Sequence, residues 1–134
     1  MPKGKVLVVE DEDTIRLPLI EYLKEHSGLE VAGARDGVDA LHQVSTKKYD
    51  VVILDVMMPY MTGIDFLDSL EALTSDPSIK HLDTLPAVIV ITAASPEHIA
   101  TSDIEHRFPS IVRAVLRKPL NVGELAQIVA ALLP

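Results

Sequence analysis

The stretch of the chain that decides the fold is YDVVILDVMMPYMTG, residues 49–63. Residues 51–54 form a continuous apolar run, mostly β-branched, which is typical of a strand buried on both faces. The run ends in a carboxylate, Asp55, after which Pro59 and Gly63 mark a loop before the next helix. We therefore expect a central strand that presents Asp55 at its carboxyl end, the edge where open α/β sheets bind ligands.

Asp55 has two common roles at such a position. A carboxylate at the end of a strand often caps the following loop or helix, and this stretch alone does not separate a cap from a ligand-binding group. The decision depends on which other side chains reach the same edge of the sheet.

The length and composition limit the class of protein. The 134 residues fit one domain, and we expect a single domain over 1–134 with no effector domain. Apolar residues make up 48% of the chain, which is typical of a globular protein, yet no apolar run approaches the roughly 18 residues that cross a bilayer. Four acidic residues occupy 10–13, so the apolar run behind the amino terminus is too short for a signal-peptide core. We expect a cytoplasmic protein that does not bind a membrane.

Charge and cysteine content exclude several functions. The chain has no cysteine, which excludes disulfides, thiolate zinc sites and cysteine nucleophiles. Its net charge of −8 argues against direct binding of nucleic acid, because phosphate contacts need clustered Lys and Arg. The five histidines lack the paired spacing of metal ligands. The acidic charge serves solubility unless the carboxylates converge on a site.

Strand and helix patterns alternate along the whole chain. Apolar, β-rich runs predict strands at 5–9, 29–34, 50–55, 87–92 and 111–116, and helical patterns lie between and after them. This alternation predicts an α/β protein with a doubly wound, mostly parallel five-stranded sheet and helices on both faces.

Two helices carry readable start signals. In the first helix Asp13 or Thr14 can serve as N-cap, and Arg16 is expected on the mostly polar, outward face. In the last helix Asn121 is the expected N-cap, with Glu124 at the third helical position.

Five polar residues close the predicted strands, and a parallel sheet brings its carboxyl ends to one edge. They are Glu10, Asp11, Asp55, Thr92 and Lys118. Three carboxylates this close repel, so they take up protons or recruit a cation. Oxygen ligands with open positions suit Mg²⁺, and a backbone carbonyl just past Asp55 can complete the set.

The same residues suit phosphoryl transfer. Lys118 offers a point charge to a carboxylate or phosphoryl oxygen, and Thr92 offers a hydroxyl donor. Asp55 beside Mg²⁺ and Lys118 is placed to act as a nucleophile on phosphorus. Each residue alone is commonly a loop charge or a cap, and it is their joint occurrence at one edge that favours a site.

Four ordered motifs resemble the receiver domain of two-component response regulators, of the CheY-like type. They are VLVVEDED at 6–13, VVILDVMMPYMTG at 51–63, VIVITA at 88–93 and LRKP at 116–119, and the resemblance covers nearly the whole chain. It implies a stand-alone signalling domain with a flavodoxin-like fold and strand order 2-1-3-4-5. The domain would be no enzyme beyond catalysing its own phosphorylation and dephosphorylation.

The resemblance also implies the roles of the site residues. Mg²⁺ would be bound by Asp11, Asp55 and the backbone carbonyl of Met57, with Glu10 acting through water. Asp55 would accept a phosphoryl group from a histidine kinase or a phosphotransfer protein, which would shift the surface that binds a downstream protein.

The remaining family positions follow the same resemblance. Thr92 would be the switch hydroxyl and Lys118 the charge partner of the phosphoryl group. The Lys118-Pro119 peptide is expected to be cis, which proline permits at low cost.

Three features depart from the family pattern. Val115 stands three residues before the lysine, where the family usually has an aromatic side chain whose rotation follows the threonine. The connection 74–86 is longer than usual, and the fourth helix, expected over 97–106, is only weakly amphipathic. The usual output surface of the family is therefore in question for this chain.

Three other classes of protein compete with the receiver domain. A phosphohydrolase of the haloacid dehalogenase type needs a second Asp two residues after the nucleophile, where this chain has Met57. A flavodoxin-type FMN carrier cradles phosphate in its first loop with Ser, Thr and Gly, whereas the acids at 10–13 would repel phosphate. A degenerate receiver that binds partners without phosphorylation is the serious alternative.

Overall fold

The computed structural model describes residues 4–56, 61–78, 85–92 and 101–133. Strands and helices alternate along the chain, as predicted, and most bounds lie within one or two residues of the expected ones. The elements are β1 Lys5–Val9, α1 Asp13–Ser27, β2 Glu30–Ala34, α2 Gly37–Thr46, β3 Val51–Asp55, α3 Gly63–Leu73, β4 Ala87–Thr92, α4 Thr101–Arg107, β5 Val112–Arg117 and α5 Val122–Leu132.

The sheet has five parallel strands in the order β2-β1-β3-β4-β5, which confirms the predicted flavodoxin-like fold. Val9 of β1 pairs with Leu54 of β3, so the residues that follow them, Glu10 and Asp55, come level at the carboxyl edge. Asp55 in turn pairs with Ile91 of β4. The register therefore brings strand ends that are far apart in sequence to one place.

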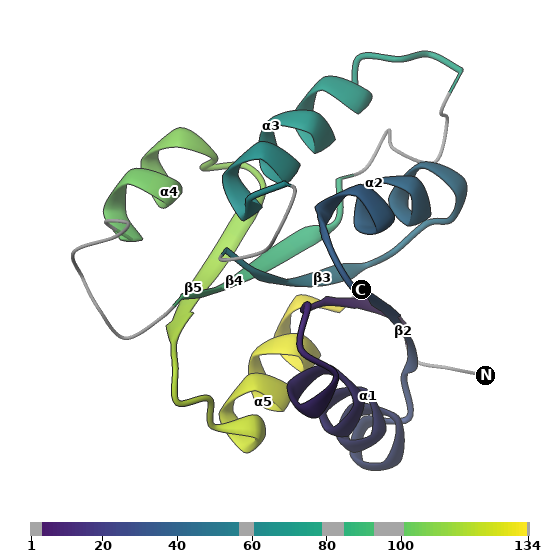
Figure 1. The fold of residues 1–134 in the computed structure, drawn as a ribbon, viewed down its shortest axis with the longest axis vertical. Coiled ribbons are helices and arrows are strands. Elements are labelled where there is room, and N and C mark those ends of the chain that lie inside the picture. The colour runs from purple at the N-terminus through teal and green to yellow at the C-terminus, as the bar shows by residue number, and fades with distance from the viewer. Residues whose placement is uncertain (1–3, 57–60, 79–84, 93–100, 134) are drawn as a thin grey trace.

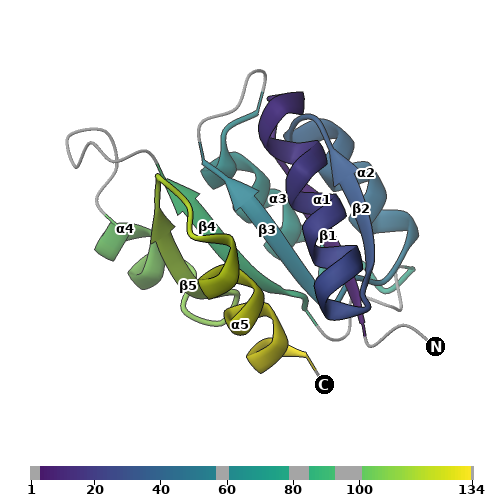
Figure 2. The same cartoon turned by 90° about the horizontal axis from the view of Figure 1, so that it is seen from below.

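Helices cover both faces of the sheet. α2, α3 and α4 lie on one face, and α1 and α5 lie on the other (Figures 1 and 2). Every residue of β3 is buried, and its side chains alternate between two apolar clusters. Val52 and Leu54 pack in the cluster that includes Phe66 of α3, and Ile53 packs in the cluster that includes Leu125 of α5. Burial on both faces explains why this strand reads as a continuous apolar run.

The helix starts were predicted correctly for α5 and wrongly for α1. Asn121 caps α5, since its side chain accepts a hydrogen bond of 2.9 Å from the backbone N–H of Glu124. The N-cap of α1 is Glu12, whose side chain makes no capping bond. The helix begins directly after Glu12, so Asp13 and Thr14 are its first two residues and neither is the cap.

Several expectations concern residues outside the described ranges. Of the connection 74–86, residues 79–84 lie outside, and of the helix expected over 97–106 only Thr101–Arg107 is described.

The Lys118-Pro119 peptide is cis, as predicted. In the parts of the chain that the structure describes, no helix has the length and apolar character to span a membrane.

Gly63 marks a close approach of backbone behind the end of β3. Its N–H donates a 3.0 Å hydrogen bond to the carbonyl of Val56. A Cβ atom at this position would lie 2.8 Å from the Cα of Val56 and 3.3 Å from the carbonyl oxygen of Asp55. Glycine is therefore required sterically at the point where α3 begins beside the strand that carries Asp55.

Replacement of Gly63 by alanine is expected to lower the free energy of unfolding by about 1–3 kcal/mol, because backbone atoms must move to admit the methyl group. The matched control is Gly123→Ala within α5, where a Cβ would lie at an ordinary 3.4 Å from the side chain of Asn121. That substitution should raise the free energy of unfolding by about 0.5–1 kcal/mol. Urea denaturation of both variants tests the pair, and an unchanged Gly63→Ala protein would contradict the close approach.

Candidate functional site

Two of the three acids of the site come from the turn between β1 and α1. The backbone N–H of Glu10 donates to the carbonyl of Ala34 at 3.0 Å, which ties the start of the turn to the end of β2. The carboxylate of Glu10 accepts a 3.3 Å bond from the backbone N–H of Glu12. Glu10 is only 4% exposed, whereas Asp11 is open to solvent. The turn thus offers one buried and one accessible carboxylate.

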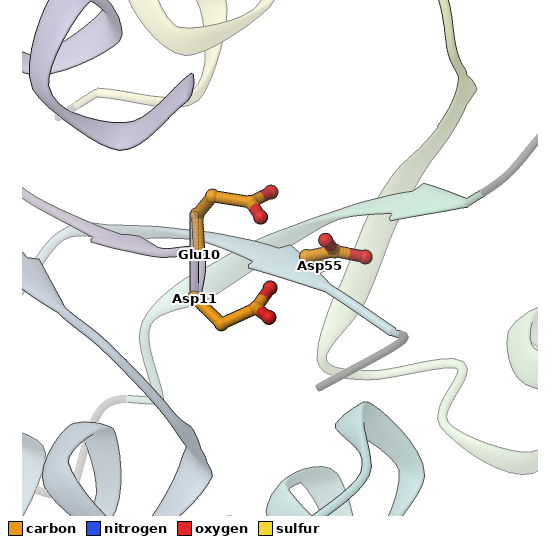
Figure 3. Close-up of side chains that lie close together, drawn as sticks. All are labelled: Glu10, Asp11 and Asp55. Carbon is orange, nitrogen blue, oxygen red and sulfur yellow. The ribbon is translucent and has the colours of Figure 1, made fainter. Parts of the chain in front are cut away.

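The third acid, Asp55, ends β3 and is 3% exposed. One carboxylate oxygen from each of Glu10, Asp11 and Asp55 lies within 4.8 Å of the other two. In Figure 3 the side chains of Glu10 and Asp11 leave the end of β1 on different sides, and both carboxylates turn toward the side where Asp55 lies. The predicted convergence of the three acids is therefore present.

Lys118 follows β5 and points into this acidic group. Its Nζ lies 3.1 Å from Oδ2 of Asp55 and 3.6 Å from Oε2 of Glu10. Its backbone N–H donates to the carbonyl of Thr92 at 2.9 Å. The lysine therefore joins the acidic group through its side chain and the end of β4 through its backbone.

Thr92 is the last residue of β4 and is buried. Because Asp55 pairs with Ile91, Thr92 lies one position beyond the partner of Asp55 at the same edge. Met57, whose carbonyl was expected to complete the metal site, lies outside the described residues. Of the predicted site residues, the structure thus brings four into one cluster and sets Thr92 at the edge beside them.

Burial and like charge change the protonation of the cluster. Burial, and then the hydrogen bond and negative charge of Asp55, raise the pKa of Glu10 to about 8, although Lys118 opposes the shift. Burial lowers the pKa of Lys118, but its bond to Asp55 and the charges of Asp55 and Glu10 outweigh this, so the net shift is upward. Burial first, and then the neighbouring Asp55, thus favour the protonated form of Glu10.

The donor set fits a magnesium ion. All three side chains offer carboxylate oxygens, which are the ligands that Mg²⁺ prefers, and Asp11 leaves one side of the group open to water or a substrate oxygen. A cation would also offset the negative charge that the three carboxylates place together. The acidic cluster of this chain is thus of the kind that a divalent cation stabilises.

Comparison with known proteins agrees with this geometry. The family model described as "Response regulator receiver domain" matches residues 6–130. The transcriptional regulatory protein PdtaR of Mycobacterium tuberculosis is 33% identical over 122 residues, 90% of this chain and 52% of that protein. The alkaline phosphatase synthesis transcriptional regulatory protein PhoP of Bacillus subtilis is 46% identical over 61 residues, 46% of this chain and 25% of that protein.

A solved receiver domain of a Francisella response regulator has the same fold. It is 29% identical, with a TM-score of 0.77, and the match covers 96% of this chain and 95% of that one. The chain belongs to the response regulator receiver family, whose members are signalling domains of two-component systems. It spans 13% to 52% of the length of the first curated relatives that it matches.

Arg16 of α1 was missed by the sequence analysis, and its predicted outward position is wrong. The side chain is buried, and its guanidinium donates to the carbonyl of Glu10 and to the carboxylate of Asp13. The sequence carries one partial signal, an acid three residues before the arginine on a helix. The other partner is a backbone oxygen, which a side-chain pattern does not reveal.

With metal removed by EDTA, the pKa of Glu10 predicts how stability depends on pH. A carboxyl whose folded pKa is about 8 and whose ordinary value is 4.5 favours the folded state less as pH rises from 4.5 to 8. Glu10→Gln removes this loss, so the free energy of unfolding of the variant, relative to that of wild type, should rise by about 3 kcal/mol between pH 5 and pH 8.

Urea denaturation at several pH values checks this difference. Glu12→Gln, which removes an exposed carboxylate of the same turn, is the matched control for the loss of one charge. If the curves for Glu10→Gln and wild type run parallel from pH 5 to pH 8, the raised pKa is refuted.

Proposed function

We propose that Asp55 is the phospho-acceptor of this receiver domain. The observation that supports this most directly is the position of Asp55 at the end of a central strand, 3.1 Å from the ammonium of Lys118 and beside two further carboxylates. An oxygen nucleophile, a fixed cation and a metal-binding acid group are the parts that phosphoryl transfer needs.

The proposed reaction exchanges one bond to phosphorus for another. A carboxylate oxygen of Asp55 forms the new O–P bond while the N–P bond of a phosphohistidine donor breaks. The imidazole leaves with the electron pair of that bond and is protonated. Asp11 and Asp55, with Glu10 acting through water, would hold a Mg²⁺ ion, which would supply positive charge near the transferring phosphoryl group.

The residues of this chain have separate parts in the proposal. Lys118 keeps its proton, because its pKa is raised, and its ammonium stabilises the negative oxygens of the phosphoryl group. Thr92 is proposed as the hydroxyl that responds to the phosphoryl group, and the carbonyl of Met57 as a further metal ligand. The proximity of Thr92 to the partner of Asp55 supports the first assignment.

The phosphoryl donor is proposed to be a histidine kinase or a phosphotransfer protein, since the family takes its phosphoryl group from such partners. We further propose that phosphorylation shifts a surface that binds a downstream protein. The domain is then a signalling module that catalyses no reaction beyond its own phosphorylation and dephosphorylation. Its cytoplasmic location remains a prediction from the sequence.

Phosphoryl uptake by Asp55 can be tested by intact-mass analysis after incubation with acetyl phosphate and Mg²⁺. Wild type should gain the mass of one phosphoryl group, and Asp55→Asn should gain none, because the amide is not a nucleophile. The gain should disappear when EDTA is present.

Two outcomes would refute this function. Equal mass gain in wild type and Asp55→Asn would move the acceptor elsewhere. No gain in wild type at any Mg²⁺ concentration would favour the degenerate receiver, which binds its partner without phosphorylation.

The metal assignment predicts the effect of a single charge. Asp11→Asn should weaken Mg²⁺ binding at least about tenfold by isothermal titration calorimetry, since it removes an accessible charged ligand. Glu12→Gln is the matched control, because it removes the same charge from the adjacent residue, which lies outside the three-acid cluster. Equal affinities of the two variants would show that only net charge matters, and would remove Asp11 from the ligand set.

A further inference from the structure

Arg16 is the one arginine among the buried polar residues of the described chain, and it is only 6% exposed. Its Nη1 donates a 2.8 Å hydrogen bond to the backbone carbonyl of Glu10, and its Nη2 pairs with the carboxylate of Asp13. We propose that Arg16 is a positioning residue, which fixes the turn between β1 and α1 in the shape that brings Glu10 and Asp11 to Asp55. Its effect on phosphorylation rests on the proposed function.

Two hydrogen bonds fix the backbone at Glu10. The N–H of Glu10 is bound by the carbonyl of Ala34, and the carbonyl of Glu10 is bound by Arg16. The peptide groups on both sides of Glu10 are therefore fixed, and with them the direction of its side chain. The second of these peptides leads directly to Asp11, so the same bond orients the accessible acid.

The arginine is itself held firmly. The backbone N–H of Arg16 donates to the carbonyl of Glu12 at 2.9 Å, in the first turn of α1. Its side chain passes Gly33 of β2, where a Cβ would lie 3.1 Å from Cδ and 3.4 Å from Nε of Arg16. The absence of a side chain at Gly33 thus leaves room for the side chain of Arg16. Hydrogen bonds of Arg16 and Glu10 fix the turn to α1 and to the end of β2.

The chemistry of the side chain explains why an arginine is used. A guanidinium is planar, always charged, and donates in several directions, so it can bind Glu10 and Asp13 together. A lysine has a compact ammonium on a flexible chain and cannot reproduce this fork. Loss of the fork would also leave the buried carbonyl of Glu10 without this partner, which favours a different shape of the turn.

A residue that only stabilised the fold would affect the melting temperature and leave the metal requirement unchanged. The experiment therefore compares three variants with wild type: Arg16→Met, Arg16→Lys and Arg35→Met. Arg35 lies directly after β2 and is exposed, so its substitution removes the same charge near the same edge without touching the turn. For each protein we would measure the melting temperature, the Mg²⁺ affinity by calorimetry, and the rate of phosphoryl uptake from acetyl phosphate as Mg²⁺ is varied.

The expected result is a split between metal requirement and maximal rate. Arg16→Met should need about tenfold more Mg²⁺ for half-maximal rate, in the range typical of groups that orient metal ligands, and its rate at saturating Mg²⁺ should stay within about threefold of wild type. The Mg²⁺ concentration for half-maximal rate of Arg16→Lys should lie between those of Arg16→Met and wild type. That of Arg35→Met should match wild type. In EDTA, NMR hydrogen exchange should show faster exchange of the Glu12 amide in both Arg16 variants.

The proposal is overturned if the folded Arg16 variants melt at lower temperature but keep the Mg²⁺ requirement and the Glu12 exchange rate of wild type. If Arg16→Met does not fold, Arg16→Lys decides the question in the same way. A failure of the proposed function would appear in the wild-type protein, as absent Mg²⁺ binding and phosphoryl uptake. In that case the hydrogen exchange in EDTA still tests whether Arg16 fixes the turn.

Discussion

The parallel register of β1, β3 and β4 is the constraint on which the rest of this structure depends. Each strand is fixed to its neighbours by backbone hydrogen bonds along its whole length, so the residue that follows one strand has a set position relative to the end of the next. A slip of one residue would turn every side chain of a strand to the opposite face. Both faces of β3 are packed, so such a slip would disrupt two apolar clusters at once.

That rigidity permits an arrangement that electrostatics alone opposes. Glu10 and Asp55 lie close together with little access to solvent, and a single lysine contacts both. Burial and mutual repulsion favour the neutral form of one carboxyl, as the raised pKa of Glu10 reflects. The apolar core stabilises the sheet strongly enough to keep the acids in place, which is the usual relation between a stable scaffold and a strained site.

Patterns along single strands were sufficient to predict a parallel α/β sheet and the residues of the acidic cluster, whereas the strand order was predicted from the family resemblance. β3 reads as a strand from its apolar run, and Asp55 from its place at the end of that run. The environment of Arg16 was not predictable in this way. Its burial depends on Gly33 of β2 and on a carbonyl of the preceding turn, and neither partner is encoded by the periodicity of α1. The cap of α1 was not predictable either, because Glu12, which precedes the helix, makes no side-chain capping bond.

Lys118 follows the position at which this chain has valine, Val115, in place of the aromatic residue of its family. Val115 pairs with Val90 across β4 and β5, where the family usually carries an aromatic ring. One residue beyond the last pair of that ladder, Lys118 contacts Asp55 by its ammonium and binds the carbonyl of Thr92 by its amide. Lys118 therefore links the charged group of the site to the backbone at the ends of β4 and β5. Neither contact involves the side chain at position 115.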